Sequence, residues 1–472
     1  MLSAGSESPG FGWSPVRNLI LAWGRLQGSP LSARLAKGAL WTIFGTALAR
    51  ILGLLSSVLA ARFLTKTAFG ELAVVQSTVA MFGTFAGLGL GVTATKYVAE
   101  WRDNQRVRCG RVVALMLWVA GAGGLVGTLV CIFGAPWLAA RTLAAPELAP
   151  VLRQSGFLVL FTTVQNVYTG ALAGLEAFQA VACVNLVGGV LGAPLVALGA
   201  LKFGLPGAVG GTILQSFFSC VAGHWVLIRQ GRKMGVPIAV WPGRGDFQAW
   251  LREGDILWRF SLPAFLSSTL VGPVNWVCNM LLVNQRNGYA EAALLSAANQ
   301  WKNFVGFLPL MLGSVLVPML ANLHAAGRGK DFVKLVKRQL VISSGLCLSL
   351  GLPLMLFSST LMRCYGRDFV EGTPVLVLTL ATTAIAATNN LLSRSMQSAG
   401  RAWLDLGFSG IWAVALVLAS FWLIPRHGAM GVAIAQAFAA VVLGLWQWHV
   451  LRRILVADAV PVARLNNGVI ES

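Results

Sequence analysis

The feature that most constrains this chain is residues 38–64, an apolar stretch long enough to cross a membrane as a helix. A helical span needs roughly 20 apolar residues. Within the stretch, Gly45, Ala49 and Gly53 recur every four residues and line one face, on which another helix can pack closely. Its one charge before the far end is Arg50. A central arginine costs roughly 2.5–3.5 kcal/mol on insertion, so we expect Arg50 to face a bundle interior or a wet cavity.

The composition indicates that most of the chain, and not only residues 38–64, lies in a membrane. Apolar residues make up 56% and charged residues 11%, with a mean hydropathy of +0.73, whereas soluble proteins carry about 25% charge. The net charge of +20 would suggest nucleic acid as the partner of a soluble protein. In a membrane protein, this net charge is explained by basic residues that keep loops in the cytoplasm. No nucleic-acid partner is therefore expected. The seven cysteines are scattered without a C-x-x-C pair, so neither a disulfide framework nor a metal site is predicted.

Twelve apolar stretches of spanning length follow the basic N-terminal segment, residues 1–37. We expect spans at about 38–61, 72–95, 112–135, 154–175, 180–201, 207–228, 260–283, 292–320, 340–362, 373–393, 403–424 and 428–450. If the N-terminus is cytoplasmic, 25 Lys and Arg residues fall in inside segments and 9 in outside segments. This asymmetry predicts a multi-pass protein of the cell (cytoplasmic or inner) membrane, with the N-terminal segment and the tail 453–472 both in the cytoplasm.

An internal repeat divides the chain into halves. Residues 207–217 (GAVGGTILQSF) and 428–438 (GAMGVAIAQAF) share six of eleven positions, and each opens the last span of a half. The longest connection, 229–259, separates spans six and seven and contains an amphipathic segment typical of a linker on the cytoplasmic surface. Duplicated bundles are typical of transporters. We therefore predict an all-α membrane protein with two pseudo-symmetric six-helix lobes, 38–228 and 260–452.

Several short motifs carry a family resemblance through their order and spacing. They are GALWTIFGTALARILGLLSSVLAARFL with FGELA, GLGLGVTATKYVAEW, FSLPAFLSS, GYAEAALLSAANQWK with VPMLANL, SAGRAWLDLG and HGAMGVAIAQ. Over most of residues 36–455 the chain resembles the polysaccharide-transporter branch, the Wzx-like O-antigen and lipid-linked oligosaccharide flippases, of the multidrug/oligosaccharidyl-lipid/polysaccharide (MOP) superfamily. The resemblance implies a MATE-like pair of lobes around a central cavity, and movement of a lipid-linked glycan between leaflets by alternating access. Membrane lipids, a polysaccharide polymerase and glycosyltransferases are the partners it suggests.

Two basic residues are the main candidates for substrate binding. Arg50 lies roughly 18 Å from the start of its span, at 1.5 Å per residue, and a guanidinium suits pyrophosphate because it binds phosphate oxygens bidentately. The alternative is an arginine bonded to the backbone or to an Asn or Gln of a neighbouring span. Lys302 belongs to a polar island in which Asn299 and Asn303 share a helix face. Its alternative is a lysine that reaches toward the periplasmic surface.

Further polar residues are candidates for the wall of the cavity, which we expect to be lined mainly by spans one, two, seven and eight. Lys96 and Arg394 lie near cytoplasmic span ends, where reaching to the interface or setting topology is the commoner role. Uncharged amides within spans could bind sugar hydroxyls, although such groups more often join helices. They are Gln165, Asn166, Asn275, Asn279, Asn389 and Asn390.

The acidic residues separate the function classes. None of the sixteen falls clearly inside a span, whereas the alternative function, an ion-coupled multidrug exporter of the same superfamily, is expected to place a carboxylate in its cavity. A third class, a glycan polymerase or ligase, needs positioned acids, histidines or metals. The chain has no carboxylate pair, no D-x-D, no H-x-x-x-H and no P-loop. We expect a transporter without catalytic residues, metal or cofactor, which flips an anionic polyprenyl-pyrophosphate-linked precursor of O-antigen, lipopolysaccharide or exopolysaccharide.

Overall fold

The secondary structure of the described residues is helical throughout. The computed structural model describes residues 30–238, 265, 269–325, 329–398 and 402–458. The N-lobe contains α2 (Pro30–Phe63), α3 (Lys66–Gly87), α4 (Leu90–Trp101), α5 (Arg106–Trp137), α6 (Ala149–Gly174) and α7 (Phe178–Met234), with short turns η1 (Leu138–Thr142) and η2 (Pro146–Leu148). The C-lobe contains α10 (Val271–Val283), α11 (Gly288–Ala325), α12 (Gly329–Leu356), α13 (Ser358–Tyr365), η4 (Arg367–Gly372), α14 (Thr373–Ser398) and α15 (Ala402–Asp458). The all-α prediction is confirmed.

Two long helices each cross the expected membrane twice, because each is broken at a glycine. Gly204 breaks α7 with φ 61° and ψ −139°, and Gly428 breaks α15 with φ 55° and ψ −130°. Such positive φ angles are accessible to glycine without a steric penalty. Eight described helices are long and apolar enough to span a membrane, and α10 is a shorter apolar helix. With α11, and with two spans each in α7 and α15, the helices correspond to the twelve predicted spans.

Some boundaries differ from those predicted. The second span begins at Lys66 rather than at residue 72, and left-handed residues Leu88 and Gly89 divide it into α3 and α4. The ninth span ends at Leu356, after which α13 forms a separate short helix. The predicted linker 229–259 begins as the last residues of α7. Most of that linker, the first residues of span seven, and most of the terminal segments 1–37 and 453–472 lie outside the described residues. Helix α2 begins at Pro30, ahead of the predicted start at residue 38, and α15 continues to Asp458.

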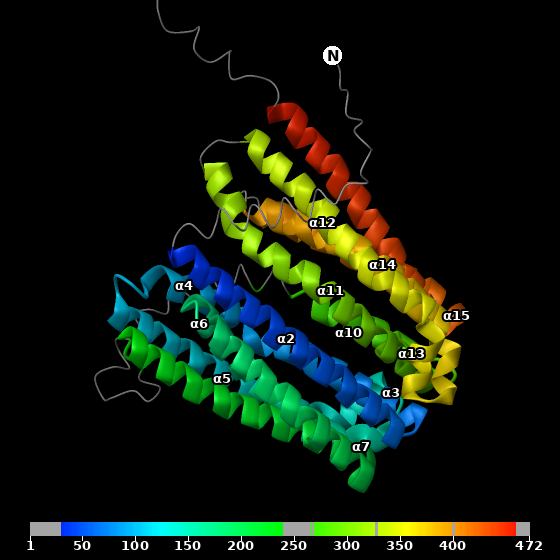
Figure 1. Ribbon diagram of the computed structural model, residues 1–472. Coiled ribbons are helices and arrows are strands. Elements are labelled where there is room, and N and C mark those ends of the chain that lie inside the picture. Colours follow the sequence, from blue (N-terminus) through cyan, green and yellow to red (C-terminus); the bar gives the residue numbers. More distant parts are fainter. Residues whose placement is uncertain (1–29, 239–264, 266–268, 326–328, 399–401, 459–472) are drawn as a thin grey trace, which may run out of the picture.

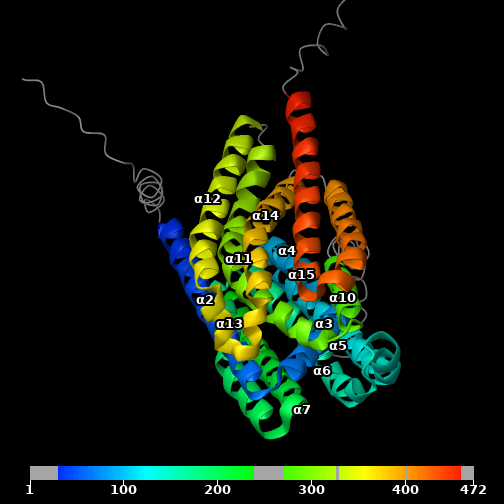
Figure 2. The same cartoon turned by 90° about the vertical axis from the view of Figure 1, so that its right-hand side faces the viewer.

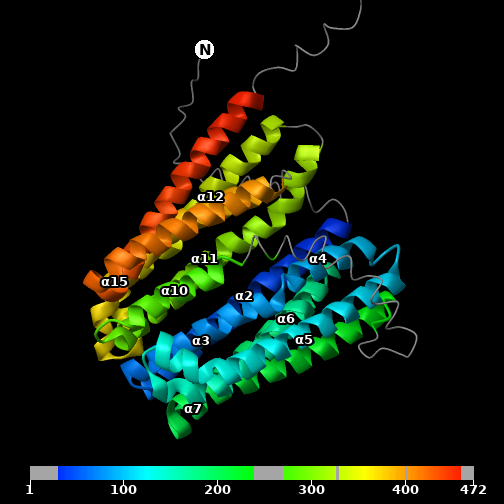
Figure 3. The ribbon, with the colours of Figure 1, turned by 180° about the vertical axis from the view of Figure 1, so that it is seen from behind.

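The two lobes meet at one end of the molecule and spread apart at the other (Figures 1 and 3). The closed end contains the end of α2, the beginnings of α3 and α11, and α13 with η4. The open end contains the beginning of α2 and the end of α15 (Figure 1). From the side, α12, α14 and α15 extend away from the N-lobe helices α5, α6 and α7 (Figure 2). The structure is therefore open toward one side of the expected membrane and closed toward the other.

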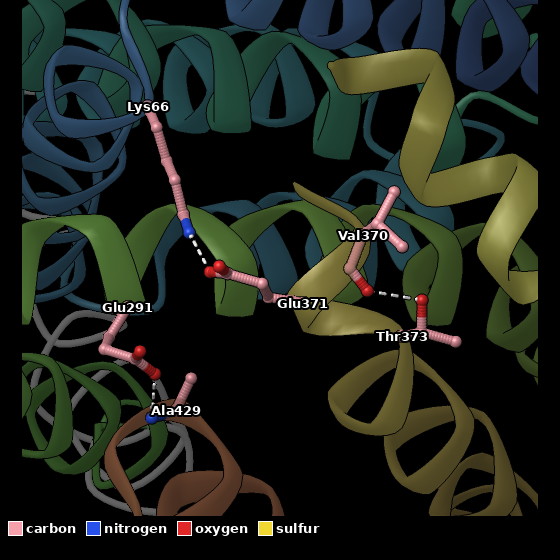
Figure 4. Close-up of polar contacts among 6 residues, drawn as sticks. All are labelled: Lys66, Glu291, Val370, Glu371, Thr373 and Ala429. Carbon is pink, nitrogen blue, oxygen red and sulfur yellow. Dashed lines mark hydrogen bonds and ion pairs between the residues drawn. The ribbon is translucent and has the colours of Figure 1, made fainter. Parts of the chain in front are cut away.

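Polar contacts join the lobes at the closed end, along a boundary that we call the seam. Lys66 Nζ lies 2.8 Å from Glu371 Oε2, which links the start of α3 to η4 (Figure 4). Arg62 Nε donates to the carbonyl oxygen of Cys364 at 2.7 Å, which links the end of α2 to the end of α13. Both contacts cross from the N-lobe to the C-lobe. The seam would have to separate for the closed end to open.

Backbone and aromatic packing reinforce the seam. At Gly70, α3 passes so close to α11 that an added Cβ atom would overlap the carbonyl oxygen of Tyr289. The hydroxyl of Tyr289 donates to the carbonyl oxygen of Leu143 at 2.7 Å. Beside this crossing, the ring of Phe69 packs edge-on against Phe369 with 5.8 Å between ring centres. These contacts belong to a hydrophobic core that contains residues of both lobes.

An acidic residue fixes the break in α15. Glu291, in the first turn of α11, accepts a hydrogen bond from the amide of Ala429 through Oε2 at 2.8 Å (Figure 4). Ala429 follows Gly428 and begins the second arm of α15, so the carboxylate satisfies a free amide at a helix N-terminus. A Cβ atom at Gly428 would lie 2.7 Å from the same oxygen. Glycine therefore provides both the backbone angle and the room for this cap.

Candidate functional site

A chamber of about 580 Å³ lies mainly within the N-lobe. Its walls come from α2, α3, α6 and both arms of α7, and α11 of the C-lobe closes one side. This volume is typical of a small-molecule binding site. The lining includes seven amide side chains, Gln76, Gln165, Asn166, Asn185, Gln215, Gln300 and Asn303. Arg50 is the one charged residue among those that line the chamber.

Most of the amides face the chamber without an internal partner. Within the described part of the chain no hydrogen bond links another residue to the side chain of Gln76, Asn166, Asn185, Gln215, Gln300 or Asn303. Ser219, which is 1% exposed, also lines the chamber, and its hydroxyl oxygen has no partner there. Because amides are strong hydrogen-bonding groups, these amide side chains are available to a ligand rich in hydroxyl groups or to water, whereas the hydroxyl of Ser219 is itself buried.

Small residues set the shape of the chamber wall. The face predicted from Gly45, Ala49 and Gly53 packs on α7 at its first two positions. A Cβ atom at Gly45 would lie 2.7 Å from Ala182 Cβ, and one at Gly189 would lie 3.1 Å from Ala49 Cα. No atom lies within 4 Å of a Cβ atom built at Gly53, which lines the chamber instead. The packing face therefore ends where the cavity begins.

A second, smaller cavity of about 200 Å³, which we call the basic pocket, adjoins the chamber. Arg50, Lys302 and Arg394 line it, and they come from α2, α11 and α14. Arg50 and Asn303 line both cavities and so mark the boundary between them. Neither lining contains an Asp or Glu residue. Three positive side chains therefore surround one small space that supplies no carboxylate to compensate them.

Arg50 is exposed to the cavities, as its position in the first span predicts. Its guanidinium carbon lies 5.7 Å from the centre of the Phe307 ring. A cation–π contact of this kind contributes roughly 0.5–1 kcal/mol at an exposed site. No ion pair involves Arg50 among the described residues. The Phe307 ring orients the guanidinium, and the N–H groups of the guanidinium stay available to a ligand.

Lys302 has an uncharged partner from the duplicated segment. Its ammonium donates to Gln436 Oε1 at 2.9 Å. In the repeat of residues 207–217 and 428–438, Gln436 occupies the same position as Gln215. The C-lobe glutamine is therefore bonded to a lysine, whereas the N-lobe glutamine faces the chamber. Room for Gln215 comes from α7, where a Cβ atom at Gly192 would lie 3.1 Å from its side chain.

The other predicted residues fall into two groups. Asn303 lines both cavities and Arg394 lines the basic pocket. The linings of the two cavities do not include Asn299, Asn275 or Lys96. Asn275 donates to the carbonyl oxygen of its own helix at Val271, at 2.8 Å.

Two of the amides weighed from the sequence join helices. Asn279 donates to Ser77 Oγ at 2.8 Å and so connects α10 to α3. Asn389 donates to the carbonyl oxygen of Ala440 at 2.7 Å and connects α14 to α15. The expectation that span seven lines the cavity is wrong for its described part, because α10 packs between α3 and α15. Spans four, five and six contribute the walls instead.

Sequence reasoning missed several residues of the chamber. Four of the amides were not singled out: Gln76, Asn185, Gln215 and Gln300. Gln76, Asn185 and Gln215 are uncharged polar residues in apolar helices, and Gln300 lies within the polar island of Lys302. Residue type alone does not reveal which way these side chains face. The repeat offered one usable signal, because it places a glutamine at the same position in both halves.

Comparison with known proteins agrees with this architecture. Residues 35–324 match the family described as "Polysaccharide biosynthesis protein". The EPS I polysaccharide export inner membrane protein EpsE of Ralstonia solanacearum is 22% identical over 396 residues, which cover 82% of this chain and 87% of that protein. An inward-facing multidrug resistance MATE family transporter of the MOP superfamily superposes with a TM-score of 0.70 at 14% identity, covering 89% of this chain and 99% of the other. For the lipid II flippase MurJ in an inward closed conformation, the TM-score is 0.66 at 13% identity, covering 88% and 87%.

The family match extends over more than half of the chain, and the fold match includes both lobes. The fold match agrees with the two-lobed helical bundle described above. The chain therefore belongs to the polysaccharide biosynthesis protein family, and it shares the fold of the MATE transporter and of the lipid II flippase to which it is similar.

Proposed function

We propose that this protein is a flippase that moves a polyprenyl-pyrophosphate-linked oligosaccharide, a precursor of a surface polysaccharide, across the cytoplasmic membrane. One observation carries the proposal. Arg50, Lys302 and Arg394 surround a pocket between the lobes, and no carboxylate lines it. Positive charge at membrane depth is costly and is normally compensated. The missing negative charge is supplied by the substrate.

The two cavities suggest how the substrate is divided. The basic pocket accommodates the pyrophosphate, because guanidinium and ammonium groups form strong charge-assisted hydrogen bonds with phosphate oxygens. The chamber accommodates the sugars, because its amides and hydroxyls can donate to and accept from sugar hydroxyl groups. Arg50 lies at the boundary, where the sugar joins the pyrophosphate. The polyprenyl chain remains in the lipid.

The shape of the molecule supports alternating access. With both termini in the cytoplasm, as the distribution of basic residues predicts, the open end faces the cytoplasm and receives the head group. The lobes then rock, the seam separates, and the glycan leaves on the other side. Glycosyltransferases would supply the substrate and a polysaccharide polymerase would consume it.

The alternatives have less support from the cavity. A cationic drug would meet three positive side chains and no carboxylate among the residues that line the two cavities. A glycan polymerase or ligase would need an acid–base group, and these linings contain no Asp, Glu, His or Cys. An increase in cellular resistance to cationic dyes on expression would nevertheless favour the drug exporter. A change in the covalent structure of a lipid-linked glycan would favour the enzyme.

The decisive test replaces Arg50. Loss of charged hydrogen bonds worth roughly 1.5–3 kcal/mol predicts that Arg50→Ala slows transport about 10- to 150-fold. Arg50→Lys should keep part of the activity, because lysine retains the charge but not the bidentate geometry. Proteoliposomes that contain a lipid-linked oligosaccharide, probed with a membrane-impermeant lectin, measure the transfer. Arg426→Ala is the matched control, because this exposed arginine stacks on Trp422 at the closed end. Full transport by Arg50→Ala at normal protein levels would reject the proposed site.

A further inference from the structure

A third hollow, of about 630 Å³, lies at the closed end and shares no residue with the chamber or the basic pocket. Its wall includes Arg62 from the end of α2, with Arg363 and Arg367 from α13 and η4. Gly366 and Val370 complete it. The two lobes thus contribute arginines to one hollow, which exists in this form only while the seam is closed. We call it the outer arginine hollow.

The charges in the outer arginine hollow are not neutralised by neighbouring acids. Arg62 is bonded to the carbonyl oxygens of Cys364 and Arg363, at 2.7 and 3.5 Å, and these partners carry no charge. Among the described residues, Arg363 and Arg367 form no salt bridge. Of the two acids of η4, Glu371 is bonded to Lys66, and Asp368 forms no salt bridge with any residue that the structure describes. The hollow therefore has the chemistry of an anion site.

The surroundings of the hollow place it at the edge of the hydrocarbon layer. Exposed apolar side chains are its neighbours along the chain: Phe63 follows Arg62 and is 44% exposed, and Leu356 and Phe357, which precede α13, are 84% and 62% exposed. Helix α13 buries Met362 and Tyr365 on one face and exposes Arg363 on the other, as amphipathic helices in the membrane interface do. Aliphatic and aromatic groups beside a cluster of arginines match a lipid, whose acyl chains and head group meet at this depth.

The position of these arginines also departs from the charge rule that governs the rest of the chain. Basic residues are depleted on the side of a membrane opposite the cytoplasm. Of the nine Lys and Arg residues expected in outside segments, four gather at the seam: Arg62, Lys66, Arg363 and Arg367. The rule that basic residues favour the cytoplasmic side cannot explain this concentration, because these residues are predicted to lie on the opposite side. A ligand that requires positive charge would explain it.

We propose that the outer arginine hollow binds the phosphate of an anionic phospholipid head group, and that this lipid holds the two lobes together in the state observed. Arginine recognises phosphate through paired hydrogen bonds. Since the hollow is complete only when α2 lies against α13, the lipid binds the seam-closed state more tightly and shifts the population toward it. The binding site stands independently of the transported substrate. Only its effect on lobe movement rests on the proposed function.

The first test measures lipid binding to the full-length protein. Native mass spectrometry of protein exchanged between phosphatidylcholine and phosphatidylglycerol gives the relative affinity for the anionic lipid. Each Arg or Lys beside an anionic lipid contributes roughly fivefold to binding, so the double variant R363Q/R367Q should bind phosphatidylglycerol about 25-fold more weakly. The control R286Q/R426Q removes two exposed arginines from the same end but outside the hollow, and should bind as the wild type does. Equal losses in both variants would overturn the proposal.

The second test locates the lipid and separates it from free phosphate. In nanodiscs, phosphatidylglycerol should slow hydrogen–deuterium exchange of peptides from residues 60–66 and 358–372 in the wild type and the control, but not in R363Q/R367Q. Inorganic phosphate added to phosphatidylcholine nanodiscs should give no such protection. Protection by phosphate equal to that by phosphatidylglycerol would assign the hollow to a free anion and reject the lipid. If the double variant is poorly folded, R367Q alone should show about fivefold weaker lipid binding, and unchanged binding would reject the site.

Discussion

Gly70 offers the sharpest test of whether the seam opens during transport. A Cβ atom at this position would overlap the carbonyl oxygen of Tyr289 and would lie 2.7 Å from its carbonyl carbon. It would also lie 3.2 Å from the amide nitrogen of Ala293. The limiting contact is with the oxygen, and carbon–oxygen contacts lie at about 3.3 Å or more, so Gly70→Ala requires α3 and α11 to separate by about 1.5 Å. All three contacted atoms belong to the backbone, and no side-chain rotation can relieve the overlap.

The energetic cost falls on one conformational state. Overpacking of this kind costs roughly 1–3 kcal/mol, and the penalty disappears once the lobes separate at the closed end. Gly70→Ala should therefore lower the ratio of seam-closed to seam-open protein by about 5- to 150-fold, since RT is about 0.59 kcal/mol. Transport should slow, because the cycle must pass through the disfavoured state. The protein should still insert and fold, because the substitution leaves each lobe intact.

Spin labels at the open end would measure this shift. Glu100, near the end of α4, and Lys334, near the start of α12, are exposed residues on different lobes. Cysteines at these positions, with exposed Cys183 and half-buried Cys364 replaced by serine, accept labels for distance measurement by pulsed electron resonance. Gly70→Ala should move the distribution toward shorter distances, because closing this end accompanies separation of the seam.

Gly121→Ala in α5 is the matched control. No atom lies within 4 Å of a Cβ atom built there, so the same chemical change meets no obstacle. This variant should keep the wild-type distances and transport rate. If Gly70→Ala and Gly121→Ala give the same distances and the same export, contact between α3 and α11 does not control the conformational equilibrium, and the reasoning is wrong.

Two contacts of the seam region differ in expected strength. Glu291→Ala should destabilise the protein by about 0.5–2 kcal/mol, because the amide of Ala429 loses its cap. Thermal unfolding of the purified protein measures the loss of stability. Glu291→Gln should lose less stability, because glutamine keeps a hydrogen-bond acceptor. Glu371→Gln should change transport and lobe distances less than about fivefold, because its partner Lys66 meets a carboxylate whose side chain is 76% exposed, and exposed pairs contribute roughly 0.2–1 kcal/mol. A wild-type melting temperature for Glu291→Ala, or loss of export in Glu371→Gln, would contradict these estimates.

The sequence was sufficient for the helical architecture, because length and apolar content report directly on the bilayer. It was less informative about backbone detail. The repeat aligns Gly207 with Gly428, yet α7 breaks at Gly204. The reason lies in packing, since a Cβ atom at Gly207 would lie 2.7 Å from the carbonyl carbon of Gly199. Gly207 is needed for that close approach, and the nearby Gly204 adopts the positive φ angle.

The candidate site could be predicted only where a residue is unusual for its surroundings. Arg50 and Lys302 stand out because charges inside spans are rare, and both line the basic pocket. The amides do not stand out, because the same residue type has opposite roles in this protein. Asn279 joins two helices, whereas Asn166 faces the chamber. The difference depends on helix rotation and on distant neighbours, which a single sequence does not encode locally.

Gln215 and Gln436 occupy the same position of the internal repeat but have different environments, which is possible because the two halves belong to one chain. In an assembly of two identical subunits, every substitution appears twice, so a lysine that occupies one glutamine would occupy both. In a single chain, each half mutates separately. One copy of the glutamine can bind an internal partner, Lys302, while the other copy faces the chamber. Two identical subunits would place both glutamines in the same environment, whereas a single chain allows the two environments to differ.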